Sequence, residues 1–125
     1  MEQIRARQQG LPFDVIRAVS DQFSCPTWTV DIADQTQEII EKKVSGVLHA
    51  AAIGELSRFK LAEHIFEELS WEVEMEPCKA TDFPMKAPRP GRTPLENKRL
   101  NELGISIMRD YQESVREFLM VHKEE

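Results

Sequence analysis

The sequence predicts an α+β domain with about three or four short strands and about four helices. Short apolar runs of strand length alternate with longer segments in which apolar residues recur at helical spacing. The 125 residues are the length of one ordinary domain, which we expect to span 1–125. A strand at 13–19, a helix at 30–43 and a strand at 46–52 are predicted to form a βαβ unit.

The first predicted strand, at 13–19, is apolar and rich in residues that favour strands, and a polar turn follows it. Thr27 or Thr29 is then expected to cap the helix at 30–43. One face of this helix is formed by side chains at helical spacing, namely Ile32, Ala33, Thr36, Ile39 and Ile40.

The segment 44–53 is largely apolar, with Ser45 and His49 as its polar side chains. Such a run is typical of a strand that is buried on both faces of a parallel sheet. We therefore expect a strand that includes 46–52, with His49 as a hydrogen-bonded residue of the core.

The second half of the chain predicts shorter elements. A helix is expected at 57–69, with Ser57 as its cap. Residues 71–75 alternate apolar and acidic side chains, which predicts a half-exposed strand. A short helix is expected at 97–103, and Asp110 is expected to open the final helix.

Charge and cysteine content limit the possible partners. The formal net charge of −6 argues against nucleic acid or an anionic membrane as a partner. No apolar run approaches the roughly 20 residues that span a bilayer, and the N-terminus lacks the apolar stretch of a signal peptide, so a cytoplasmic location is expected. Cys25 and Cys78 lie far apart without CxxC spacing, which favours free thiols over a disulfide.

The turn 20–27 is the first candidate site. A short polar segment between a strand and a helix presents backbone N–H groups and the positive end of the helix dipole. Asp21 and Gln22 could hydrogen-bond a sugar or a base, and Trp28 could stack on a ring. The alternative is a simple capping turn, in which Pro26 and Thr27 start the helix.

The second candidate site is the basic loop 79–99, which overlaps the irregular stretch 77–94 with its five prolines. A guanidinium held by adjacent prolines, as at Arg89, suits a diphosphate. The alternative is a solvated loop whose charges pair with nearby glutamates. The basic residues of this segment are Lys79, Lys86, Arg89, Arg92, Lys98 and Arg99.

The patterns of other sites are missing from the sequence. No glycine-rich turn opens a helix after a strand, so no dinucleotide site is recognised. The three histidines have no spacing typical of a metal site. Ser20, Ser24 and Cys25 have no evident partner base, so no catalytic nucleophile is expected.

Five short motifs occur in an order and spacing that are similar to those of a known family. The motifs are Asp21-Gln22 with Pro26-Thr27, Gly46-Val47-Leu48-His49-Ala50, Arg89-Pro90, Thr93-Pro94-Leu95-Glu96-Asn97-Lys98 and Leu103-Gly104-Ile105. In this order they resemble the C-terminal, substrate-binding part of the dTDP-4-dehydrorhamnose reductases, which are extended short-chain dehydrogenases/reductases. The resemblance runs from about Gly10 to Leu119.

The resemblance implies the substrate-binding portion of an NAD(P)H-dependent reductase of dTDP-L-rhamnose biosynthesis. The N-terminal Rossmann cofactor domain of that family is expected to be absent, so that this chain holds no cofactor of its own. The family's catalytic Tyr-x-x-x-Lys pair is also missing, because Val115 stands four residues after Tyr111, the single tyrosine. The chain by itself is therefore expected to be inactive.

The resemblance also implies roles for the two candidate segments. The residues expected to face the deoxysugar of a nucleotide sugar are Asp21, Gln22, Thr27 and Trp28. Arg89 and Arg92 are expected to face its diphosphate or nucleotide part.

Two other interpretations remain open. The first is a non-catalytic interaction or regulatory module derived from this family. The second is an enzyme split over two chains, with a separate Rossmann-domain chain as the partner. In the parent reductases, the strand equivalent to 47–51 lies at a sheet edge, and an exposed apolar edge here would favour a homodimer or a docking surface.

Overall fold

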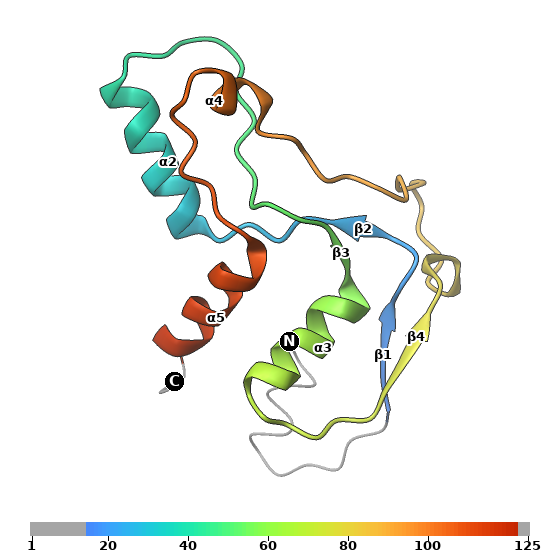
Figure 1. Cartoon of the computed structure of the whole chain (residues 1–125). Coiled ribbons are helices and arrows are strands. Elements are labelled where there is room, and N and C mark those ends of the chain that lie inside the picture. The colour runs from blue at the N-terminus through green and yellow to red at the C-terminus, as the bar shows by residue number, and fades with distance from the viewer. Residues whose placement is uncertain (1–14, 123–125) are drawn as a thin grey trace.

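A computed structural model describes residues 15–122, and it confirms the α+β class (Figure 1). Among these residues, four helices accompany four short strands in two small sheets. In chain order the elements are β1 (Ile16–Val19), β2 (Phe23–Ser24), α2 (Thr29–Glu41), β3 (Leu56–Ser57), α3 (Arg58–Glu68), β4 (Met75–Cys78), the 3-10 turn η1 (Ala80–Asp82), α4 (Lys98–Glu102) and α5 (Tyr111–Val121).

The first sheet pairs β1 with β4 in parallel, so that Ile16 lies opposite Met75 and Val19 opposite Cys78. Helix α3 contacts both strands. A parallel βαβ arrangement is therefore present, but its helix is α3 and its second strand is β4, in place of the predicted helix 30–43 and strand 46–52. The pairing that was predicted between 13–19 and 46–52 is wrong.

The position of β4 also corrects the strand predicted at 71–75. Only Met75 of that segment is part of β4. Trp71 instead closes the end of α3, because its N–H donates to the carbonyl of Phe66 at 2.9 Å and its ring stacks on the Phe66 ring. The strand forms at 75–78 because these residues pair with β1. The alternation of apolar and acidic residues in the sequence does not show which segment will have a pairing strand.

The second sheet was not predicted, because its strands are only two residues long. β2 lies antiparallel to β3, and the loop after Pro90 joins its other side. The N–H of Phe23 donates to the carbonyl of Gly91 at 2.8 Å, and the N–H of Thr93 donates to the carbonyl of Phe23 at 2.9 Å. The predicted turn 20–27 thus contains a strand of its own.

The strand predicted at 46–52 is not formed. These residues run as extended chain without a strand partner, Val47 is 80% exposed, and His49 is exposed rather than part of the core. The apolar edge on which a homodimer was predicted is therefore not a strand edge, and the homodimer itself stays a prediction.

Side chains take the place of a neighbouring strand along this segment. The guanidinium of Arg99 donates to the carbonyls of Ser45 at 2.9 Å and Val47 at 3.2 Å. The amide of Asn97 pairs with both backbone groups of Ala51. The carbonyls of Ser45 and Val47 and both backbone groups of Ala51 are thus hydrogen-bonded without a sheet, which an apolar run in the sequence does not reveal.

Helix α2 confirms the helix predicted at 30–43, but its cap and its buried face differ from expectation. Its N-cap residue is Trp28, and no side chain caps the helix. The buried residues are Asp31 and Gln35, whereas Ile40 is 69% exposed. Asp31 and Gln35 are buried because distant parts of the chain supply hydrogen-bond partners for their polar groups.

The other predicted caps are confirmed. Ser57 accepts a hydrogen bond from the N–H of Lys60 at 3.2 Å and starts α3. Asp110 accepts one from the N–H of Gln112 at 2.8 Å and starts α5. Helix α4 is followed by Gly104, whose φ of +66° is the left-handed conformation that commonly ends a helix.

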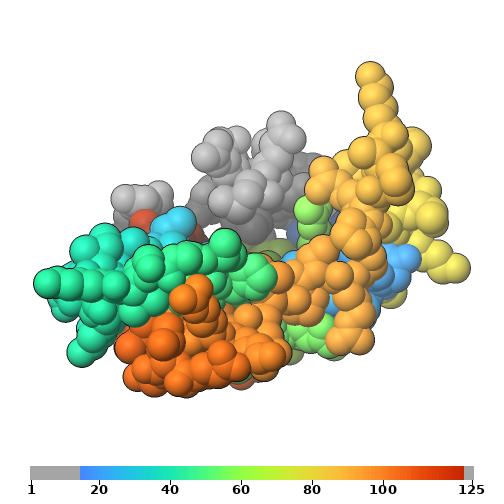
Figure 2. All heavy atoms as spheres, turned by 90° about the horizontal axis from the view of Figure 1, so that it is seen from above, coloured from blue at the N-terminus to red at the C-terminus, as the bar shows by residue number. Residues whose placement is uncertain are grey.

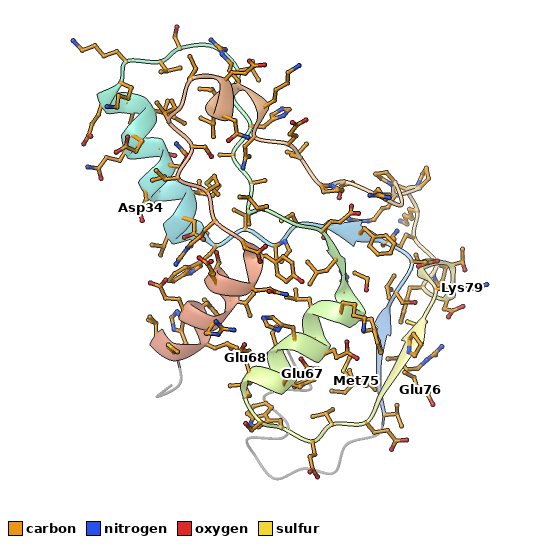
Figure 3. All side chains as sticks on the ribbon, in the orientation of Figure 1. Asp34, Glu67, Glu68, Met75, Glu76 and Lys79 are labelled. Carbon is orange, nitrogen blue, oxygen red and sulfur yellow. The ribbon has the colours of Figure 1, made fainter. Side chains whose placement is uncertain are left out.

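The helices α3 and α5 lie side by side (Figure 1). Glu68 lies on the side of α3 toward α5, where its carboxylate accepts a hydrogen bond from Arg116 at 3.0 Å (Figure 3). Within residues 15–122, none of the helices combines the length and apolar character needed to cross a membrane. The buried apolar side chains are Ile16, Val19, Ala51, Ala52, Leu56, Phe66, Cys78, Leu100 and Met108.

Candidate functional site

A cleft of about 460 Å³ lies at the end of the parallel strand pair. Three guanidinium groups line it, and each comes from a different part of the chain: Arg17 from β1, Arg58 from the start of α3, and Arg89 from the proline-rich loop. Gln22 lines the same cleft. The remaining lining residues are Ala18, Val19, Ala80, Phe83 and Met85.

Asp21 does not line the cleft itself, but it holds Ala80, which does. Its carboxylate accepts a hydrogen bond from the N–H of Ala80 at 2.8 Å, which ties the turn after β1 to η1. Asp82 fixes the same turn by accepting from the N–H of Lys79 at 3.1 Å and pairing with Arg17 at 3.4 Å. Lys79 lies at the end of β4, beside η1 (Figure 3).

The loop that carries Arg89 is anchored at both ends. It begins at η1, and it rejoins the fold where Gly91 and Thr93 pair with β2. Between these points the segment 83–90 is exposed and projects from one end of the molecule (Figure 2, gold to light orange). Because the ends are anchored, binding a ligand costs less chain entropy than it would in a free loop.

Arg92 is placed differently from Arg89. Its guanidinium forms an ion pair with Glu55 across the second sheet, and it does not line the cleft. Of the two arginines that were expected to face a diphosphate, only Arg89 therefore lines the cleft.

Thr27 and Trp28 also lie away from the cleft. The hydroxyl of Thr27 accepts a hydrogen bond from the N–H of Ala52 at 3.0 Å. The Trp28 ring packs edge-on against Phe118, and the guanidinium of Arg109 lies 5.8 Å from its centre. In this structure both side chains join α2 to neighbouring parts of the chain.

The electrostatics of the cleft favour an anion. The chain carries a net charge of −6, yet three cations converge here. Within the described part of the chain, no carboxylate lies within ion-pair distance of Arg58 or Arg89. Guanidinium groups without a protein counter-ion are suited to bind phosphate oxygens.

Cys25 lies in the same turn as the candidate residues, and its thiol is protected. The Sγ atom donates a hydrogen bond to the carbonyl of Ala52 at 2.8 Å. Burial raises the pKa of the Cys25 thiol above its usual value, and the negative charge of Asp110 adds to this effect. A neutral thiol is a poor nucleophile. Both Cys25 and Cys78 are free cysteines.

Of the residues predicted from the sequence, Gln22 and Arg89 line the cleft, and Asp21 holds Ala80 at its edge. Arg17 and Arg58 also line it and were not predicted. Arg17 lies within the predicted strand 13–19, and Arg58 directly follows the Ser57 cap. Their convergence was hidden, because it depends on the pairing of β1 with β4 and on the packing of α3 against both strands.

Two patterns that are typical of cofactor and metal sites are absent from residues 15–122. Neither strand of the parallel pair leads into a glycine-rich turn and a helix, which a dinucleotide site requires. Between residues 15 and 122, no three His, Cys, Asp or Glu side chains are grouped so that they could hold a metal ion.

The fold is shared with solved reductases. A dTDP-4-dehydrorhamnose reductase from Clostridium acetobutylicum superposes with a TM-score of 0.88 at 30% identity, over 98% of this chain and 42% of that one. A second, from Yersinia enterocolitica, gives a TM-score of 0.82 at 25% identity, over 94% and 41% of the two chains.

Sequence relatives indicate the same family. The dTDP-4-dehydrorhamnose reductase of Mycolicibacterium smegmatis is 36% identical over 104 residues, which are 82% of this chain and 32% of the relative. A probable dTDP-4,6-dihydroxy-2-methyloxan-3-one 4-ketoreductase of Streptomyces antibioticus is 33% identical, over 82% of this chain and 35% of its own. The chain thus spans about a third of the length of these relatives. The sequence model of the RmlD substrate binding domain matches residues 6–123, and the chain therefore belongs to that family.

Proposed function

We propose that this chain binds a dTDP-activated deoxysugar, as the substrate-binding part of an NAD(P)H-dependent dTDP-4-dehydrorhamnose reductase. The observation that carries the proposal is the convergence of Arg17, Arg58 and Arg89 on one cleft. Membership of the RmlD substrate binding domain family supports a nucleotide sugar as the anion. In this proposal Arg58 and Arg89 hold the diphosphate, and Arg17 contributes less because Asp82 already pairs with it.

Gln22 is placed to hydrogen-bond the part of the ligand that adjoins the diphosphate, because it lines the same cleft as Arg89. We assign Asp21 mainly to positioning, since its carboxylate holds the backbone of Ala80. Thr27 and Trp28 stabilise the turn through their contacts with Ala52 and Phe118 and do not bind the ligand directly. Arg92 contributes less to binding than Arg89, because Arg92 already pairs with Glu55.

The reducing step belongs, in this proposal, to residues other than these 125. Two sequence observations support this part of the proposal: no glycine-rich turn opens a helix after a strand, and no Tyr-x-x-x-Lys pair occurs. The chain by itself is thus expected to bind the sugar nucleotide without reducing it. The partner in the reaction is a Rossmann cofactor domain that supplies NAD(P)H and the catalytic pair.

Calorimetric titration with dTDP-L-rhamnose tests the proposal. Arg89→Ala should weaken binding by about 10- to 150-fold, which corresponds to the free energy that hydrogen bonds to a charged group contribute. Lys86→Ala is the matched control, because it removes the same charge from the same exposed loop but does not line the cleft.

The proposal fails if folded wild-type protein gives no heat with millimolar ligand and Arg89→Ala behaves identically. A pull-down that recovers a protein partner under the same conditions would then favour the interaction module.

A further inference from the structure

The cleft also has an apolar wall. Phe83 and Met85 line it together with the three arginines, and these two residues are 48% and 57% exposed. Both come from the loop that carries Arg89. A half-exposed aromatic ring beside a cationic cleft offers a flat apolar face to a ligand that also carries negative charge.

The backbone of Phe83 is anchored to the 3-10 turn η1. Its N–H donates to the carbonyl of Ala80 at 3.2 Å, so that Phe83 directly ends η1. Asp21 holds η1 at Ala80, and Asp82 holds it at Lys79. The ring is therefore presented from a short, anchored turn, and stacking on it costs little ordering of the backbone.

The cleft combines two kinds of group, guanidinium groups and an aromatic ring, which suit a ligand with two different parts. Guanidinium groups bind phosphate oxygens, whereas an aromatic ring binds the flat face of a base. We propose that Phe83 stacks on the base of the nucleotide, so that this cleft selects a nucleoside diphosphate sugar over anions that have no base. The inference rests on the proposed function and adds a specificity-determining residue to it.

The experiment compares two probes, dTDP and inorganic pyrophosphate, by calorimetry on the complete chain. Phe83→Ala should weaken the binding of dTDP by about 5- to 150-fold, which is the range that stacking on an aromatic side chain supplies. The affinity for pyrophosphate should stay the same, because this probe has no base. Phe83→Trp keeps a stacking surface and should bind dTDP at least as well as the wild type.

Leu95→Ala is the matched control. Leu95 is 53% exposed and follows the same proline-rich stretch, but it does not line this cleft. It should leave the affinities for both probes unchanged.

Two negative results can be told apart. If Phe83→Ala binds dTDP like the wild type while Arg89→Ala weakens both probes, the stacking role is wrong and the proposed function stands. If the wild type binds neither dTDP nor pyrophosphate, the proposed function fails, and the stacking role fails with it.

Discussion

The side-chain amide of Asn97 pairs with both backbone groups of Ala51. The N–H of Ala51 donates to Oδ1 of Asn97 at 2.8 Å, and Nδ2 of Asn97 donates to the carbonyl of Ala51 at 2.7 Å. Both residues are buried. One side chain thereby makes the two hydrogen bonds that a neighbouring strand would make, and it holds the extended segment that leads to β3.

Asn97→Ala is expected to lower the free energy of unfolding by about 1–3 kcal/mol, because the buried backbone groups of Ala51 lose their partner. Urea denaturation followed by circular dichroism measures the change. Asn101→Ala, on the exposed side of the same short helix, should change stability by less than about 0.5 kcal/mol. Equal effects of the two substitutions would show that the Asn97–Ala51 pair does not stabilise the fold.

Asp31→Asn is expected to cost about 1.5–3 kcal/mol, the range for hydrogen bonds to a charged group. Asp31 is only 6% exposed, and its oxygens accept from Nε of Arg109 at 2.8 Å and from Oγ of Ser114 at 2.6 Å. The substitution keeps the size of the side chain but removes the negative charge with which Asp31 of α2 binds Arg109 and Ser114. Thermal unfolding provides the measurement.

Glu117→Gln is the matched control for Asp31→Asn. Glu117 pairs with the same Arg109, but its side chain is 50% exposed. Solvent screening should limit its contribution to less than about 1 kcal/mol. A larger loss for Glu117→Gln than for Asp31→Asn would contradict the importance of the buried pair.

Ser57→Ala should destabilise the protein by about 1 kcal/mol, since it removes the side-chain cap of α3. Thr29→Ala makes a useful comparison, because Thr29 is the first residue of α2 and no side chain caps that helix. It should therefore have an effect below about 0.5 kcal/mol. Denaturant midpoints for the two variants decide the point, and a larger shift for Thr29→Ala would refute the assignment of caps.

Alkylation of Cys25 by iodoacetamide should have its pH midpoint above the usual thiol value of about 8.5. Burial is the main cause of the raised pKa, and Asp110 is the second. The rate is measured in a Cys78→Ala background, which leaves Cys25 as the single cysteine. Asp110→Asn should lower the midpoint only in part, because burial remains and asparagine still caps α5.

The same shift sets the direction of a stability change. The folded protein keeps the Cys25 proton to a higher pH than the unfolded chain does. The free energy of unfolding should therefore fall as the pH rises through the thiol pKa of the unfolded chain. Substitution of Cys25 by alanine should remove this part of the decline, and an unchanged pH profile would contradict the link.

Local signals in the sequence were sufficient for the helices and for part of the site. Ser57 and Asp110 cap their helices through bonds to residues two or three positions away, and such contacts can be inferred from residue type. Gln22 and Arg89 lie in short family motifs, and the structure places both at one cleft. Side-chain partners far along the chain were beyond this kind of inference.

The sequence by itself determined the α+β class, the positions of the helices and the family, since these follow from periodicity, local caps and short motifs. Tertiary structure alone decided that 46–52 is no strand, that Asp31 and Gln35 are buried, and that Arg17 and Arg58 join Arg89. The physical reason is distance along the chain. Asn97 satisfies Ala51 from 46 residues away, and Gln35 reaches the carbonyl of Ile105 across 70.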